Sequence, residues 1–172
     1  VASSCLPRGA SAGTWIALLV FAGPLPGGAQ QTSPNGPEFQ VNTYTTLAQY
    51  EAAAAFHTDG RFVIAWTSQG SPIDPDLSSV HLRRHSATGT ALANQFQVNT
   101  YTAGVQFDPA ISIAASGRFV VTWTSGGSGQ SDTAGKSIQA RIFDGNGVPL
   151  TPQFQVNAYT TGDQIVSDVA WY

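Results

Sequence analysis

The sequence predicts an all-β protein of four-stranded antiparallel repeats, forming a partial β-propeller of about two blades plus a fragment. The first observation behind this prediction is a motif, Phe-Gln-Val-Asn-x-Tyr-Thr, that recurs at 39–45, 96–102 and 154–160. Successive copies start 57 and 58 residues apart, and a fixed period of this length is typical of repeat architectures. The second observation is composition: β-branched and aromatic residues fill the segments between loops, and no helical periodicity follows Gln30.

The first two strands of each unit are predicted at 52–57 and 61–67, and at 110–115 and 118–124 in the next unit. The first strand is rich in small residues, and a tight turn ending in glycine leads into the second. The second strand is apolar on both faces, which is typical of a strand buried on both sides. A first strand of small residues, followed by a second strand that is buried on both faces, is typical of a propeller blade.

The third strand is predicted at 80–85 and 138–143, where polar and apolar residues alternate. A turn then leads into the fourth strand, which is the recurring Phe-Gln-Val-Asn block. Aromatic residues that recur at matched positions are expected in the core of the repeats. They are Phe62, Trp66, Phe119, Trp123, Phe39, Phe96 and Phe154. The alternative architecture is a tandem row of β-sandwich-like repeats.

The chain divides into an expected signal peptide at 1–29, a linker at 30–38 and a β-repeat region at 39–172. The repeat region comprises a strand at 39–45, repeats at 46–102 and 103–160, and a truncated repeat at 161–172. The signal peptide is predicted from Arg8, a short apolar run at 14–22 and small residues before Gln30. The apolar run is shorter than the ~20 residues that span a bilayer. We therefore expect a secreted, extracellular or cell-surface protein, whose single cysteine, Cys5, is removed with the signal.

The charge balance argues against a nucleic-acid partner. Seven Lys and Arg residues stand against ten Asp and Glu, for a formal net charge of −3, and no basic run is present. Binding to a phosphate backbone needs clustered cations.

Candidate ligand-binding residues lie in the loop after the second strand. Asp74 and Asp76 supply two carboxylates in one unit, and Asp132 lies in the corresponding loop of the next. Calcium takes about six to eight oxygen ligands, so each loop alone supplies too few. The sequence therefore predicts no metal site and no cofactor, with calcium as the one ion these loops could take.

Two arginines recur on the third strand and are also candidates. Arg83 and Arg141 occupy equivalent positions, so their role belongs to the unit itself. We expect them at an interface between units or paired with a loop carboxylate, and a ligand-binding role is the alternative.

No catalytic residue is predicted. Ser68 and Ser125 follow tryptophan strands but lack the Gly-x-Ser-x-Gly pattern of a nucleophile elbow. The three histidines, His57, His81 and His85, are expected at the surface, because neither His81 nor His85 recurs in the next unit.

The two strand motifs carry a family resemblance that spans residues 38–172. The Phe-Gln-Val-Asn-Thr strand alternates with a Gly-x-Phe-Val-Val-x-Trp-x-Ser strand at 60–68 and 117–125, with Ile64 in place of one valine. These units resemble a repeat of large secreted bacterial proteins, in which such repeats form propeller-like modules beside calcium-binding or adhesive segments. The resemblance implies an extracellular bacterial location and implies no reaction.

These observations lead to a functional hypothesis and two alternatives. We expect a non-enzymatic extracellular binding or adhesion module that works through loops at one rim of the propeller. Its partners would be a surface glycan or protein, together with the remaining repeats of a longer chain. The alternatives are structural spacer repeats of a larger exported protein, and a non-catalytic fragment of a secreted hydrolase.

Overall fold

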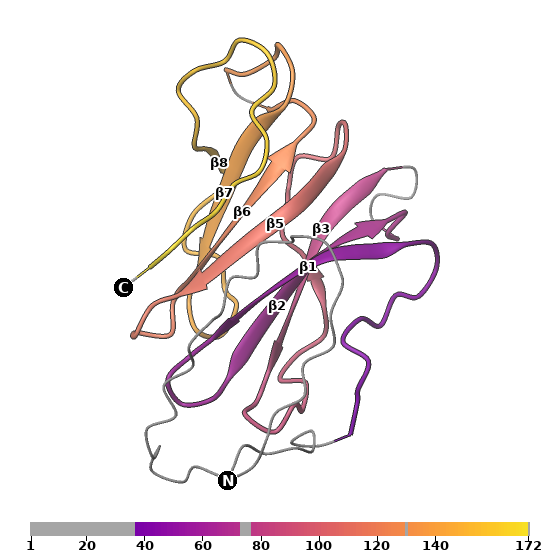
Figure 1. Cartoon of the computed structure of the whole chain (residues 1–172), viewed down its shortest axis with the longest axis vertical. Coiled ribbons are helices and arrows are strands. Elements are labelled where there is room, and N and C mark those ends of the chain that lie inside the picture. The colour runs from indigo at the N-terminus through magenta and orange to yellow at the C-terminus, as the bar shows by residue number, and fades with distance from the viewer. Residues whose placement is uncertain (1–36, 73–76, 130, 172) are drawn as a thin grey trace, which may run out of the picture. The chain divides into compact units, whose positions relative to one another are not determined.

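The computed structural model describes residues 37–72, 77–129 and 131–171. These residues form eight antiparallel strands in two four-stranded sheets, with no helix (Figure 1). The first sheet contains β1 (Gln49–Phe56), β2 (Phe62–Gln69), β3 (Ser78–His85) and β4 (Phe96–Gln97), in that order. The second contains β5 (Gln106–Ile113), β6 (Phe119–Ser125), β7 (Ser137–Phe143) and β8 (Phe154–Gln155), in the same order. The all-β prediction is confirmed, with one sheet per repeat.

Both sheets belong to one compact unit, Glu38–Tyr172. The expected signal peptide lies outside the described residues. In the part of the chain that is described, no helix is long and apolar enough to cross a membrane.

The two sheets share their register. In the first sheet, β2 pairs with β3 along its whole length, and Trp66 lies opposite His81. In the second sheet, Trp123 lies opposite Gln139, the equivalent position. Each buried indole donates its Nε1 proton to a glutamine at the start of the first strand. The acceptor is Gln49 for Trp66 and Gln106 for Trp123, both at 3.1 Å.

The first strand of each sheet starts earlier than predicted and contains an irregularity. β1 begins at Gln49, and its register shifts between Tyr50 and Ala53. Glu51 lies within this bulge at a φ of 53°, and its equivalent Asp108 has a φ of 55°. These are left-handed conformations that non-glycine residues rarely adopt. A bulge inserts an extra residue and bends the strand.

The bulge places a backbone N–H against the preceding unit. Asp108 N donates to Thr67 Oγ1 at 3.2 Å and to the Glu51 carboxylate at 2.8 Å. One unit further on, Val166 has a φ of 58° and donates its N–H to Thr124 Oγ1, also at 3.2 Å. The same contact therefore links each unit to the next.

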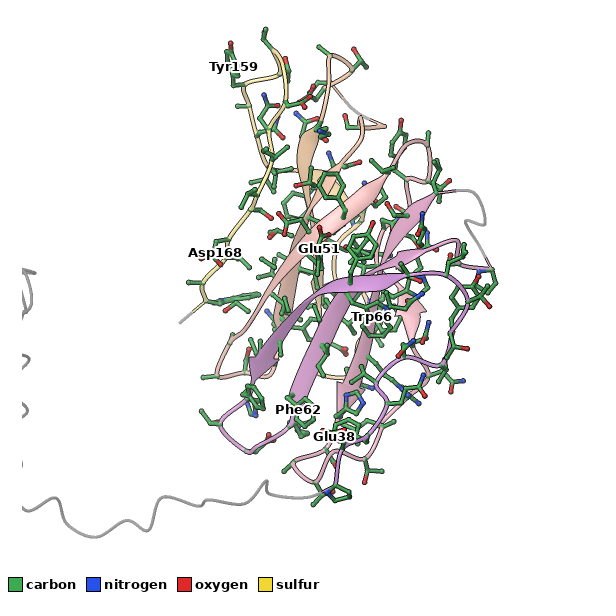
Figure 2. All side chains as sticks on the ribbon, turned by 45° about the vertical axis from the view of Figure 1, so that its right-hand side comes forward. Glu38, Glu51, Phe62, Trp66, Tyr159 and Asp168 are labelled. Carbon is green, nitrogen blue, oxygen red and sulfur yellow. The ribbon has the colours of Figure 1, made fainter. Side chains whose placement is uncertain are left out.

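The main core lies between the two sheets, where β5 packs across the first sheet (Figure 1). It joins apolar residues of both sheets. The buried members are Val63, Ala65, Val80, Leu82 and Val98, with Ile111, Phe119, Val121, Trp123 and Phe143. Outside this cluster, Trp66 is also buried, on the β2 face that carries Phe62 (Figure 2).

The expectation of a core position is not met for all the recurring aromatic residues. Phe62 and Phe96 are half-buried, whereas Phe39 is 49% and Phe154 36% exposed. Their equivalent Phe96 packs on Phe143 of the next unit, with ring centroids 5.7 Å apart. Among the described residues, Phe154 meets no sheet of a following unit, and Phe39 meets no sheet of a preceding unit.

The truncated repeat runs across the second sheet, as β5 runs across the first (Figure 1). Gln164 N donates to Lys136 O beside β7, and Trp171 N donates to Ser112 Oγ on β5, both at 2.9 Å. The described residues of this segment therefore contact the second sheet at β5 and beside β7.

The face of the first sheet that points away from the second sheet is open. Tyr50 and Phe56 of β1 are 42% and 70% exposed, whereas their equivalents Phe107 and Ile113 are half-buried. The difference arises because the first sheet covers β5, and no described residues of a preceding unit cover β1.

Candidate functional site

Two pockets occur at equivalent positions of the two repeats. The pocket on the first unit has a volume of about 330 Å³ and is lined by Thr43, Tyr44, Pro72, His81, Gln95, Phe96 and Gln97. The pocket on the second unit has a volume of about 180 Å³ and is lined by Thr100, Tyr101, Gly129, Gln139 and Gln153. Every residue of the second set has its repeat equivalent in the first. We refer to these as the junction pockets, because each joins one copy of the motif to the unit that follows it.

The Thr-Tyr wall of each pocket is held by a glutamine from the following copy. Gln153 Oε1 accepts the backbone N–H groups of Thr100 at 2.8 Å and Tyr101 at 3.1 Å. Gln95 Oε1 accepts the N–H groups of Thr43 and Tyr44 in the same way. The glutamine stands directly before the fourth strand, so a complete pocket needs a motif and the unit that follows it.

The base of each pocket is a buried polar side chain on the third strand. In the second unit, Gln139 Nε2 donates to Ser137 Oγ at 2.9 Å, and Gln139 Oε1 accepts from Gln153 Nε2 at 3.2 Å. In the first unit His81 replaces the glutamine and keeps both partners: its Nε2 lies 3.1 Å from Ser79 Oγ, and its Nδ1 lies 3.2 Å from Gln95 Nε2.

The prediction of surface histidines is wrong for two of the three. His81 is 4% and His85 1% exposed. His85 stacks on Phe62 with ring centroids 5.1 Å apart, and Phe39 of the preceding motif packs on it at 5.4 Å. The absence of histidine from the second unit misled the prediction, because glutamine and phenylalanine fill the same buried places there.

Burial decides the charge state at the base of the first pocket. It lowers the pKa of His81 to about 4, because a buried imidazolium loses its hydration. His81 is therefore neutral at physiological pH, and its Nδ1 can accept the Gln95 amide proton. Among the described residues that line the junction pockets, none carries a formal charge.

Of the three predicted acidic ligands, Asp132 lies in the described part of the chain. Asp74 and Asp76 lie outside the described residues. Asp132 is fully buried, and its carboxylate accepts Asn157 Nδ2 at 2.8 Å and Ala134 N at 3.4 Å. The described part of the chain holds no group of three or more His, Cys, Asp or Glu residues suited to a metal ion.

The two recurring arginines lie at the interface between units. Arg83 Nη1 donates to Val41 O at 2.8 Å, and Arg141 Nη1 donates to Val98 O at 3.0 Å. Val41 and Val98 belong to the motif of the preceding copy in each case. Both guanidinium groups thus bind backbone carbonyls and line neither pocket.

Sequence reasoning missed the residues that form the pockets. The signal that could have revealed them is the glutamine before the fourth strand, which recurs as Gln95 and Gln153 while Glu38 stands at that position before the first motif. The recurring tyrosines, Tyr44 and Tyr101, were visible only as part of the motif.

No protein-family model matches the chain, and a search of curated proteins finds no match either.

Proposed function

We propose that this chain is a non-enzymatic extracellular binding module of the adhesion type, which takes its partner into the junction pockets. One observation carries the proposal: the same positions of the repeat build the same pocket twice. Recurrence of a pocket is not needed for folding alone, because the core between the sheets already joins the units. Loops and pockets on a rigid β scaffold commonly carry recognition.

Repetition of the contacts between units supports a propeller-like arrangement. The Asp108–Thr67 contact returns as Val166–Thr124, and the arginine contact also occurs twice. Two units with the same contacts between them, followed by a segment that lies on the second sheet, fit a ring of sheets better than a row of two-sheet sandwiches.

The open face of the first sheet supports the same arrangement. Ile64 of β2 is half-buried, whereas its equivalent Val121 is fully buried under the neighbouring sheet. The motif at 39–45 forms no strand in the described chain, although its equivalent β4 pairs with β3. A further copy of the repeat would cover the face and pair with the motif.

The binding proposal is tested with tyrosine variants. The purified protein is applied to arrays of surface glycans and to immobilised extracellular proteins. Replacing Tyr44 and Tyr101 together with alanine should abolish binding to any partner found. Tyr159 is the matched control: it holds the same motif position, is 69% exposed and lines neither of the two junction pockets. Binding that survives the double substitution, or no binding by the native protein, would contradict the proposal and favour a structural spacer.

A further inference from the structure

The junction pockets have a lining that selects for a neutral, hydroxyl-rich ligand. Their walls carry a threonine hydroxyl, a tyrosine and amide groups, with a neutral imidazole in one of them. A charged ligand would lose hydration there and find no opposite charge among the lining residues. The described lining therefore fits a neutral occupant better than an anion or a cation.

The tyrosine gives each pocket an aromatic surface. Gly129 approaches the Tyr101 ring so closely that a Cβ at that position would lie 3.3 Å from Cδ2. In the first unit, the Tyr44 hydroxyl donates to Gly70 O. Both rings are thus supported by the loop that follows the second strand. A fixed aromatic ring beside polar groups fits a ligand with an apolar face and a polar edge.

The polar groups of the pockets are held in place before any ligand arrives. In the second pocket, the Gln153 amide binds the wall through Thr100 N and the base through Gln139. Thr100 is exposed, and its Oγ1 donates to Gln153 Oε1 at 3.3 Å. The lone pairs of Thr100 Oγ1 can therefore accept a ligand hydroxyl. Fixed partners reduce the entropy that binding would otherwise cost.

The pocket volumes restrict the size of the occupant. Values of about 180 and 330 Å³ lie below or at the lower end of the ~300–1,000 Å³ of small-molecule sites. One sugar ring fits this space, whereas a large cofactor or a folded partner does not.

We infer that each junction pocket binds one neutral sugar residue of a glycan, with the ring against the tyrosine and the hydroxyls toward the threonine hydroxyl. This inference rests on the proposed binding function and names its ligand class. Two pockets on one compact unit would engage two sugars of a polymer or of a dense glycan surface. Such bivalence raises avidity by about 10²–10⁴-fold over a single site when the geometry permits both contacts.

The test is an NMR titration of the ¹⁵N-labelled protein. The probes are the methyl glycosides of glucose, galactose, mannose and N-acetylglucosamine, with the methyl glycoside of N-acetylneuraminic acid as the acidic comparator. At least one neutral glycoside should shift the side-chain amides of Gln95 and Gln153 and the backbone amides of Thr100 and Tyr101. The acidic glycoside should shift none of them.

Variants separate a specific site from an unfolding effect. Tyr101→Ala should weaken binding at the second pocket at least tenfold and leave the Gln95 signals responsive, which shows that the protein is still folded. If Tyr101→Ala does not fold, Thr100→Arg blocks the same pocket from an exposed position. Tyr159→Ala should change nothing.

The results of the titration distinguish sugar binding from binding to an extracellular protein. If no neutral glycoside shifts either pocket, while an extracellular protein binds through Tyr44 and Tyr101, the sugar inference is overturned and the binding function stands. If neither ligand class binds, both are overturned. A response to the acidic glycoside alone also overturns the inference. So do chemical-shift changes that persist unaltered in both Tyr101→Ala and Thr100→Arg.

Discussion

Replacing His81 with glutamine should remove a specific part of the acid sensitivity of this fold. His81 has the partners that Gln139 has in the second unit, so His81→Gln keeps the pocket base intact. Burial lowers the His81 pKa from 6.5 to about 4. The unfolded chain therefore takes up a proton at a higher pH than the folded one.

The sign and size follow from these two pKa values. Above about pH 6.5 His81 is neutral in both states and costs nothing. As the pH falls from 6.5 toward 4, protonation of the unfolded state lowers stability by about 1.4 kcal/mol per pH unit. At pH 5 the loss is about 2 kcal/mol, and the full loss below pH 4 is about 3 kcal/mol.

Urea unfolding followed by tryptophan fluorescence measures this difference. At pH 7.5, His81→Gln and the native protein should agree within about 1 kcal/mol, and at pH 5 the variant should be more stable by about 2 kcal/mol. The comparison cancels every other titrating group. Gln139→His should introduce the same acid sensitivity into the second unit.

A second histidine provides a control of opposite sign. The pKa of His57 is raised, mainly by its hydrogen bond with Asp59 and then by the Ala115 carbonyl. Its contribution is present at low pH and is lost as the pH rises through the folded pKa. His57→Gln should therefore lower stability on the acid side. If native and His81→Gln curves stay parallel from pH 7.5 to 5, His81 is not held neutral by burial and the reasoning fails.

Three further substitutions test the packing by urea unfolding at pH 7.5. Gln106→Leu leaves the indole N–H of buried Trp123 without its acceptor and should lower the free energy of unfolding by about 1–3 kcal/mol. Gln164→Leu, at the half-buried equivalent position, should lower it by under about 0.5 kcal/mol. Equal losses would contradict the role of Gln106 as the acceptor for Trp123. His85→Phe removes a buried Nδ1 that has no hydrogen-bond partner among the described residues and should stabilise the fold by about 1 kcal/mol; a loss of stability would show that the nitrogen is satisfied. Arg141→Met removes the link to the preceding motif and should cost about 1–3 kcal/mol, and no change would mean that the link contributes nothing.

The strands were predictable where the chain carries an uninterrupted apolar pattern. β2 and β6 fall within one or two residues of the predicted ranges, because both faces of these strands are apolar. β1 was predicted too short, because it begins with Gln49, Tyr50 and Glu51, which look like a loop. Pairing through a bulge, with Glu51 in a left-handed conformation, adds these residues to the sheet, and no sequence pattern indicates that pairing.

The environment of a repeated residue was less predictable than its secondary structure. Phe39, Phe96 and Phe154 begin the same motif, yet only Phe96 has a sheet on each side of it. The pockets were missed for a related reason: their walls come from one copy and their glutamine from the next. Periodicity within a unit predicts strands, but it contains no information about which copies meet.

The dependence of each pocket on the following unit determines how many pockets the proposed array would contain. The motif at 154–160 carries the same tyrosine as the others, but Tyr159 is 69% exposed and no glutamine among the described residues holds its backbone N–H as Gln153 holds that of Tyr101. A pocket is therefore a property of the junction between a motif and the next complete unit. In a longer array the number of pockets would rise with each added unit, and avidity for a repeating ligand would rise with it. The contacts from Gln95 to Tyr44 and from Gln153 to Tyr101 hold the pocket walls and would then set the binding capacity of the array.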